Sequence, residues 1–110
     1  MGNYEIRLSC RELAMLEVLY LVGSKESYEN AALLMEGLNT LRPALVQELL
    51  EKCSSIKVKR LFMHLAERFK HPWVKKVAVS KIDFGKGKRV IEEGGRFDAK
   101  YRISVPKINL

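Results

Sequence analysis

Apolar residues recur at helical spacing through the first half of the chain. The run from 11 to 21 is dense in helix formers and predicts a helix, with Ser9 three residues before Glu12 as a capping box. A second helix is predicted from about Ser27, and a third from Pro43, because proline suits the first helical turn. These three helices are expected to build the scaffold of the fold.

The clearest helical pattern follows a cap at Ser54 or Ser55 and ends before Pro72. Its apolar residues follow the spacing i, i+3, i+4, i+7, i+8 and i+11 and are Val58, Leu61, Phe62, Leu65, Ala66 and Phe69. Basic residues and a histidine recur every three or four positions, so we expect one exposed stripe of Lys57, Arg60, His64 and Arg68. Lys59 lies beside that stripe.

Alternation with a period of two marks candidate strands near both ends of the chain. Residues 4–8 predict a first strand, and from Ser80 onward the period is two again, with late strands at 88–92 and 101–105. We expect the two late strands to pair antiparallel and the first strand to join them, because a lone hairpin is marginally stable. The predicted class is α+β, with four to five helices packed on a small, mostly antiparallel sheet.

Charge is distributed unevenly along the 110 residues, which suffice for one domain. The chain has 20 Lys and Arg against 13 Asp and Glu, a formal net charge of +7. Residues 1–54 contain 5 basic and 8 acidic residues, whereas 55–110 contain 15 basic and 5 acidic. The second half is therefore expected to carry a cationic surface, with nucleic acid as the first candidate partner. A basic face that serves only solubility is the alternative.

The sequence has no segment near the roughly 18 consecutive apolar residues that a membrane span requires. The amino terminus also lacks the pattern of a secretory signal, so we expect a cytoplasmic protein with no membrane partner. Cys10 and Cys53 are far apart and in no CxxC or metal pattern, which predicts two reduced thiols.

Motifs for catalysis or metal binding are not found in the sequence. The glycine and lysine segment at 85–88 resembles a phosphate loop, but Ile82 and Arg89 occupy the places of its glycine and its Ser or Thr. His64 and His71 are seven residues apart, which does not match the i, i+4 spacing of a zinc site on a helix. We therefore expect no enzymatic activity, no metal and no cofactor.

A cationic surface is the remaining candidate for function. Glycines at 85 and 87 let a backbone approach phosphate oxygens while flanking side chains neutralise charge, although a plain turn with solubilising lysines explains them equally well. The candidate residues for binding nucleic acid or a partner are Lys57, Lys59, Arg60, His64, Arg68, Lys86, Lys88, Arg89 and Arg96. Asp83 and Asp98 stand beside turns, where bonds to the backbone are expected. Trp73 and Tyr101 are expected in the core.

Several segments together resemble the carboxy-terminal domain of AbiEi-type antitoxins from bacterial type IV toxin–antitoxin, or abortive infection, systems. The resemblance is carried by SIKVKRLF (55–62), AER (66–68), HPW (71–73), IDFGKGKR (82–89), GGRFD (94–98) and YRISVP (101–106). Upstream, residues 9–21 and 31–50 are similar too, including MEGL (35–38) and LRP (41–43). The order and spacing of these segments fit the family along nearly the whole chain.

The resemblance implies an antitoxin that neutralises a nucleotidyltransferase-like toxin, AbiEii, without a stable complex, and represses its own operon. It also implies that this domain neutralises the toxin and assists DNA binding. Longer members begin with a winged helix-turn-helix, and nothing before Tyr4 resembles one. We therefore expect residues 1–110 to be a single domain that is either part of a longer protein or a short natural member.

Two other functions are compatible with the same residues. The chain is alternatively an auxiliary module of a transcriptional regulator that binds nucleic acid, with DNA as the first candidate and RNA as the second. It is otherwise a dimerisation or protein-interaction module that uses an exposed apolar patch near Trp73.

Overall fold

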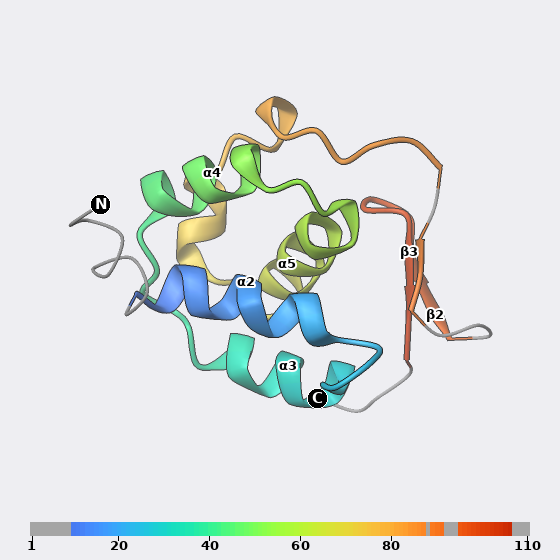
Figure 1. Ribbon diagram of the computed structural model, residues 1–110. Helices are drawn as coiled ribbons and strands as arrows, with labels where there is room; N and C mark the ends of the chain where they lie inside the picture. The colour runs from blue at the N-terminus through green and yellow to red at the C-terminus, as the bar shows by residue number, and fades with distance from the viewer. Residues whose placement is uncertain (1–9, 88, 92–94, 107–110) are drawn as a thin grey trace.

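The computed structural model describes residues 10–87, 89–91 and 95–106. Helices precede a small sheet along the described chain (Figure 1). The α-helices are α2 (Arg11–Leu21), α3 (Tyr28–Glu36), α4 (Pro43–Lys52) and α5 (Ile56–Arg68). Two 3-10 turns follow, η1 (Pro72–Lys76) and η2 (Val79–Lys81), and then the strands β1 (Arg89–Val90), β2 (Arg96–Asp98) and β3 (Ile103–Val105). The α+β class is confirmed.

Local sequence signals account for where the helices begin. The Ser27 hydroxyl accepts a hydrogen bond from the backbone N–H of Asn30 at 3.0 Å and caps α3, and Pro43 is the first residue of α4. Ser55 caps α5 in the same way as Ser27 caps α3. The cap of α2 is the sulfur of Cys10, which accepts from Leu13. Ser9, which we predicted as part of a capping box, lies outside the described residues.

Helix α5 is the centre of the molecule. Figure 1 shows it between the sheet on one side and the other three α-helices on the other. It packs against α2, α3 and η1, and all residues from Val58 to Ala66 are buried. A helix enclosed in this way has no long solvent-facing stripe, whatever the polarity of its residues.

The sheet has mixed pairing, with the strand order β1-β3-β2 among the described residues. β2 pairs antiparallel with β3, with Phe97 opposite Ser104, whereas β1 pairs parallel with β3, with Val90 opposite Ser104. Our expectation that the two late strands pair antiparallel was therefore wrong. The hairpin between β2 and β3 takes one edge of β3, and β1 joins the other edge in parallel. The predicted strand at 4–8 lies outside the described residues.

The structure also differs in part from what we expected between residues 73 and 87. Residues 80–84, predicted to alternate with a period of two, form the end of η2 and the segment after it, whereas the turn expected at 85–87 is confirmed, with φ of 73° at Gly85 and 72° at Gly87. The side chain of Trp73 is only 4% exposed, which confirms its expected place in the core, so Trp73 is not itself part of an exposed apolar patch. The large apolar side chains exposed in the described chain are Tyr20, Leu21, Leu33, Leu34 and Phe97.

The longest described helix, α5, has 13 residues, and none of the described helices is long and apolar enough to span a lipid bilayer.

Candidate functional site

The basic residues of α5 do not form the exposed stripe that the sequence predicted. Arg60 is fully buried, and Lys59 and His64 are 5% and 6% exposed. The prediction was wrong because other segments cover these side chains: the turn at 82–87 covers Lys59 and Arg60, the end of α2 binds Lys57, and α3 and β2 enclose His64. Charged and polar side chains are stable in a protein interior only when they form hydrogen bonds there.

Two lysines of α5 bind backbone carbonyl groups of neighbouring segments. The Lys57 ammonium donates to the carbonyl oxygens of Tyr20 at 3.1 Å and Val22 at 2.9 Å, at the C-terminal end of α2. A positive charge at that end of a helix also interacts favourably with the helix dipole. The Lys59 ammonium donates to the carbonyl oxygen of Asp83 at 2.8 Å. Both lysines therefore hold the framework together.

Arg60 attaches the glycine turn to the start of β3. Its guanidinium donates to the carbonyl oxygen of Lys86 at 3.4 Å, to that of Arg102 at 3.0 Å, and twice to that of Phe84. The expected turn at Asp83 is confirmed, because its carboxylate accepts from the N–H of Gly85 at 2.9 Å. The turn at 82–87 is thus fixed to α5, and the Lys86 side chain is exposed on it.

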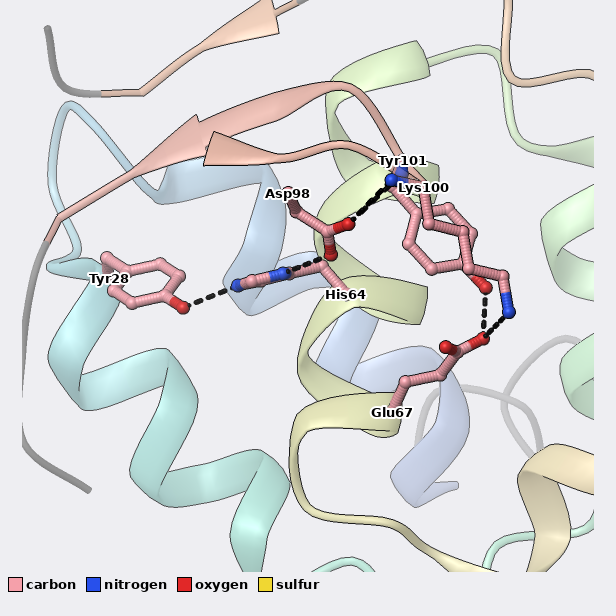
Figure 2. Close-up of polar contacts among 6 residues, drawn as sticks. All are labelled: Tyr28, His64, Glu67, Asp98, Lys100 and Tyr101. Carbon is pink, nitrogen blue, oxygen red and sulfur yellow. Dashed lines mark hydrogen bonds and ion pairs between the residues drawn. The ribbon is translucent and has the colours of Figure 1, made fainter. Parts of the chain in front are cut away.

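A chain of hydrogen bonds connects α3, α5 and β2 (Figure 2). The Tyr28 hydroxyl lies 2.7 Å from Nε2 of His64, and Nδ1 of His64 lies 2.7 Å from Oδ2 of Asp98. An ionised carboxylate only accepts hydrogen bonds, so Nδ1 carries a proton and donates to Asp98. In the neutral ring Nε2 then accepts from Tyr28.

The second carboxylate oxygen of Asp98 accepts from the backbone N–H groups of Lys100 and Tyr101 at 2.9 Å and 3.3 Å. The backbone bonds predicted for Asp98 are therefore confirmed. Its contact with His64 was missed, because the two residues are 34 positions apart and no local motif links them.

Burial controls the protonation of this hydrogen-bonded chain. Burial lowers the pKa of His64, although the hydrogen bond to Asp98 raises it and so opposes part of the effect. Burial likewise raises the pKa of the Tyr28 hydroxyl. His64 is consequently the neutral imidazole at pH 7, and Tyr28 is a neutral phenol.

A cavity of about 350 Å³ lies between the C-terminal half of α5 and β2. His64, Glu67 and Arg68 line it from α5, and residues 96–99 line it from β2 and the turn that follows. Three of the residues predicted from the sequence, His64, Arg68 and Arg96, therefore meet at one place. Arg96 is exposed, Arg68 is half-buried and His64 is at the buried end.

The two carboxylates at this cavity are engaged by donors. Asp98 is held by His64 and the backbone, as described above. Figure 2 shows Glu67 turned toward Lys100 and Tyr101, and its Oε2 accepts from the Lys100 ammonium at 2.8 Å and from the Tyr101 hydroxyl. Burial, and then the contact with Glu67, raise the pKa of Tyr101.

The other predicted residues whose side chains the structure describes do not line this cavity. Lys57 is placed at the end of α2, Lys59 and Arg60 hold the glycine turn, and Lys86 is exposed on that turn. Arg89 belongs to β1, and Lys88 lies outside the described residues. Within the described chain there is no group of three or more His, Cys, Asp or Glu residues that could hold a metal ion. Both cysteines are free and half-buried.

Comparison with known proteins gives one finding, which bears on the whole chain. A family model described as "Transcriptional regulator, AbiEi antitoxin, Type IV TA system" matches residues 1–106. No curated protein and no solved structure matches the chain. The match confirms the resemblance seen in the sequence, and the chain belongs to the AbiEi antitoxin family of type IV toxin–antitoxin systems.

Proposed function

We propose that this chain neutralises a nucleotidyltransferase-like toxin in the cytoplasm and assists repression of its own operon through a basic surface. The observation that carries the proposal is the family match over residues 1–106. The distribution of charge supports it, because the second half of the chain keeps many cations in solvent after the fold has buried others. Such a surface attracts polyanions and acidic protein surfaces.

Among the described residues of this half, the exposed charge is strongly one-sided. Its exposed basic residues in the described chain are Lys70, Lys75, Lys76, Lys81, Lys86, Arg96, Lys100 and Arg102. Among the described residues from 55 to 106, Asp83 is the acidic residue with an exposed side chain, whereas Glu67 and Asp98 are half-buried and hydrogen-bonded.

The residues predicted for binding divide into two groups on this proposal. Those that contact the partner are Arg68, Lys86, Lys88, Arg89 and Arg96. Those that act by holding these residues in place are Lys57, Lys59, Arg60 and His64, which are bonded to the neighbouring segments described above.

The test is rescue of growth when the cognate toxin is induced, with the toxin taken from a nucleotidyltransferase-like gene next to this one. The double variant Lys86→Glu/Arg96→Glu changes only exposed side chains, so it should fold and yet lose rescue. Lys52→Glu is the matched control, because Lys52 is exposed on α4 in the acidic half. Full rescue by the folded double variant would show that the basic surface does not carry the activity.

A second candidate function is auxiliary binding of nucleic acid, with DNA ahead of RNA. It is favoured by the cavity at which Arg68 and Arg96 meet, since arginine is well suited to phosphate groups. Affinity for DNA should then fall steeply as salt is added, because phosphate contacts release counterions. A gel-shift titration in which binding is independent of salt would exclude this function.

A further inference from the structure

We propose that the cavity between α5 and β2 binds a phosphate group of a nucleic acid strand, with Arg68 and Arg96 as its ligands. The inference rests on the proposed contact with nucleic acid and assigns it to one place.

The two arginines reach one cavity from two different elements. Arg68 is the last residue of α5, and Arg96 is the first residue of β2. Burial is the main cause of the pKa shifts of His64 and Tyr28, and the charges of both arginines act on these two groups in the lowering direction. A guanidinium group donates hydrogen bonds in a planar fork that matches the oxygen spacing of phosphate.

A partly buried hydrogen bond fixes the backbone positions from which the two arginines extend. His64 is one helical turn before Arg68, and Asp98 is two residues after Arg96 on the same strand. The 2.7 Å bond between His64 and Asp98 therefore fixes α5 against β2 close to both arginines. A site held in this way binds without first ordering its own parts, which lowers the cost of binding.

Among the described residues, two guanidinium groups and two carboxylates line the cavity, those of Arg68 and Arg96 and those of Glu67 and Asp98. The Lys100 ammonium lies outside the lining and 2.8 Å from Glu67, so it adds a third positive charge beside the cavity. The neutral His64 ring adds no charge, and both of its nitrogens are already bonded.

The size and the surroundings of the cavity favour a phosphate group that is part of a nucleic acid strand. A volume of about 350 Å³ is at the lower end of the range for ligand pockets. The cavity therefore has room for a phosphate group and part of the attached nucleotide. Lys100 is exposed beside the cavity, next to Glu67, and would attract a neighbouring phosphate. Inorganic phosphate and a mononucleotide share the same chemistry and serve as probes of the site.

The test measures binding of a fluorescein-labelled duplex of the promoter DNA by anisotropy, over a series of salt concentrations. Arg96→Gln should weaken binding about tenfold and reduce the slope of log K against log salt by about 1, because one phosphate contact is lost. Arg96→Lys should keep most of the slope and still weaken binding several-fold, because it keeps the charge and loses the fork. Lys81→Gln removes an exposed charge on η2 and should weaken binding less than twofold.

Equal losses of DNA affinity in Arg96→Gln and Lys81→Gln would overturn the site. The contribution of Arg96 would then be a general electrostatic attraction that any exposed cation provides. A second measurement is an NMR titration of the protein, in the absence of DNA, with inorganic phosphate. Phosphate should shift the amide signals of residues 64–68 and 96–99 in the wild type and not in Arg96→Gln. Shifts that are absent, or spread over the whole chain, would overturn the site.

The two proposals fail in different ways. If phosphate shifts the cavity signals and no DNA binds, the assignment to nucleic acid is wrong and the site takes phosphate from another source. Loss of the phosphate response together with intact rescue from the toxin would count against the site alone. An intact phosphate response in a protein that never rescues growth would count against the antitoxin proposal alone.

Discussion

The guanidinium of Arg60 donates two hydrogen bonds to the backbone carbonyl oxygen of Phe84, with nitrogen–oxygen distances of 2.9 Å and 2.7 Å. Arg60 has no exposed surface, and Phe84 is half-buried in the turn that follows η2. A side chain that would ordinarily bind a partner at the surface is here a structural link between α5, this turn and β3.

Arg60→Ala should lower the free energy of unfolding by about 3 kcal/mol or more, because it leaves buried carbonyl groups without donors. Arg60→Lys should fall between Arg60→Ala and the wild type, since one ammonium cannot reproduce the fork. Urea unfolding followed by circular dichroism measures both. Lys86→Ala is the control on the same turn and should change stability by no more than about 0.5 kcal/mol. Equal stability of Arg60→Ala and Lys86→Ala would contradict the structural role.

Stability should decrease as the pH falls below about 6.5, the ordinary pKa of histidine. Burial lowers the pKa of His64 in the folded state, so the unfolded state binds more protons in this range. The stabilisation is complete above the unfolded pKa and is lost as the pH falls toward the folded one, by at most about 1.4 kcal/mol per pH unit. Urea midpoints between pH 7.5 and pH 5 measure it. His64→Gln should flatten this dependence, and an equally steep fall in that variant would assign it to other groups.

Glu12 and Arg42 form a second link, between the first turn of α2 and the start of α4. Burial raises the pKa of Glu12, but the hydrogen bonds from the side chain and backbone of Arg42 overcome this and lower it to about 2. The stabilisation is therefore present above the usual pKa of 4.5 and is lost as the pH falls toward 2. Glu12→Gln should be less stable than the wild type at pH 7, and the difference should disappear near pH 2. A constant difference across this range would show that the charge of Glu12 does not matter.

Gly85 and Gly87 offer a matched pair of substitutions in one turn. Both have positive φ, so Gly87→Ala, which meets open space, should cost about 1 kcal/mol from backbone strain alone. A Cβ at Gly85 would also lie 3.2 Å from the Ile56 side chain, so Gly85→Ala should cost about 2 kcal/mol or more. Thermal unfolding compares the two variants. If Gly85→Ala costs no more than Gly87→Ala, the turn does not pack tightly on α5.

Helix starts and the turn at Asp83 were predictable because they depend on neighbours in the sequence. Ser27 and Ser55 each bond an N–H three residues ahead, and Pro43 occupies the first turn of α4 without losing a hydrogen bond. The family was recognisable for a similar reason, since its characteristic segments occur in order along the sequence. Pairing of the short strands was not predictable in the same way. The period of two indicates which residues of a strand share a face of the sheet, but it does not indicate which strand lies beside it.

The sequence by itself determined the α+β class, the helices, the family and the excess of positive charge after residue 55. The tertiary structure decided which of those charges meet solvent. Spacing on a helix places Lys57, Arg60 and His64 on one side, but it does not say what covers that side. The end of α2, helix α3, the turn at 82–87 and β2 cover it. Carbonyl groups satisfy the cations, and Tyr28 and Asp98 satisfy the histidine. Arg68 and Arg96 remain at the cavity because α5 and β2 are brought together by residues 34 positions apart in the chain.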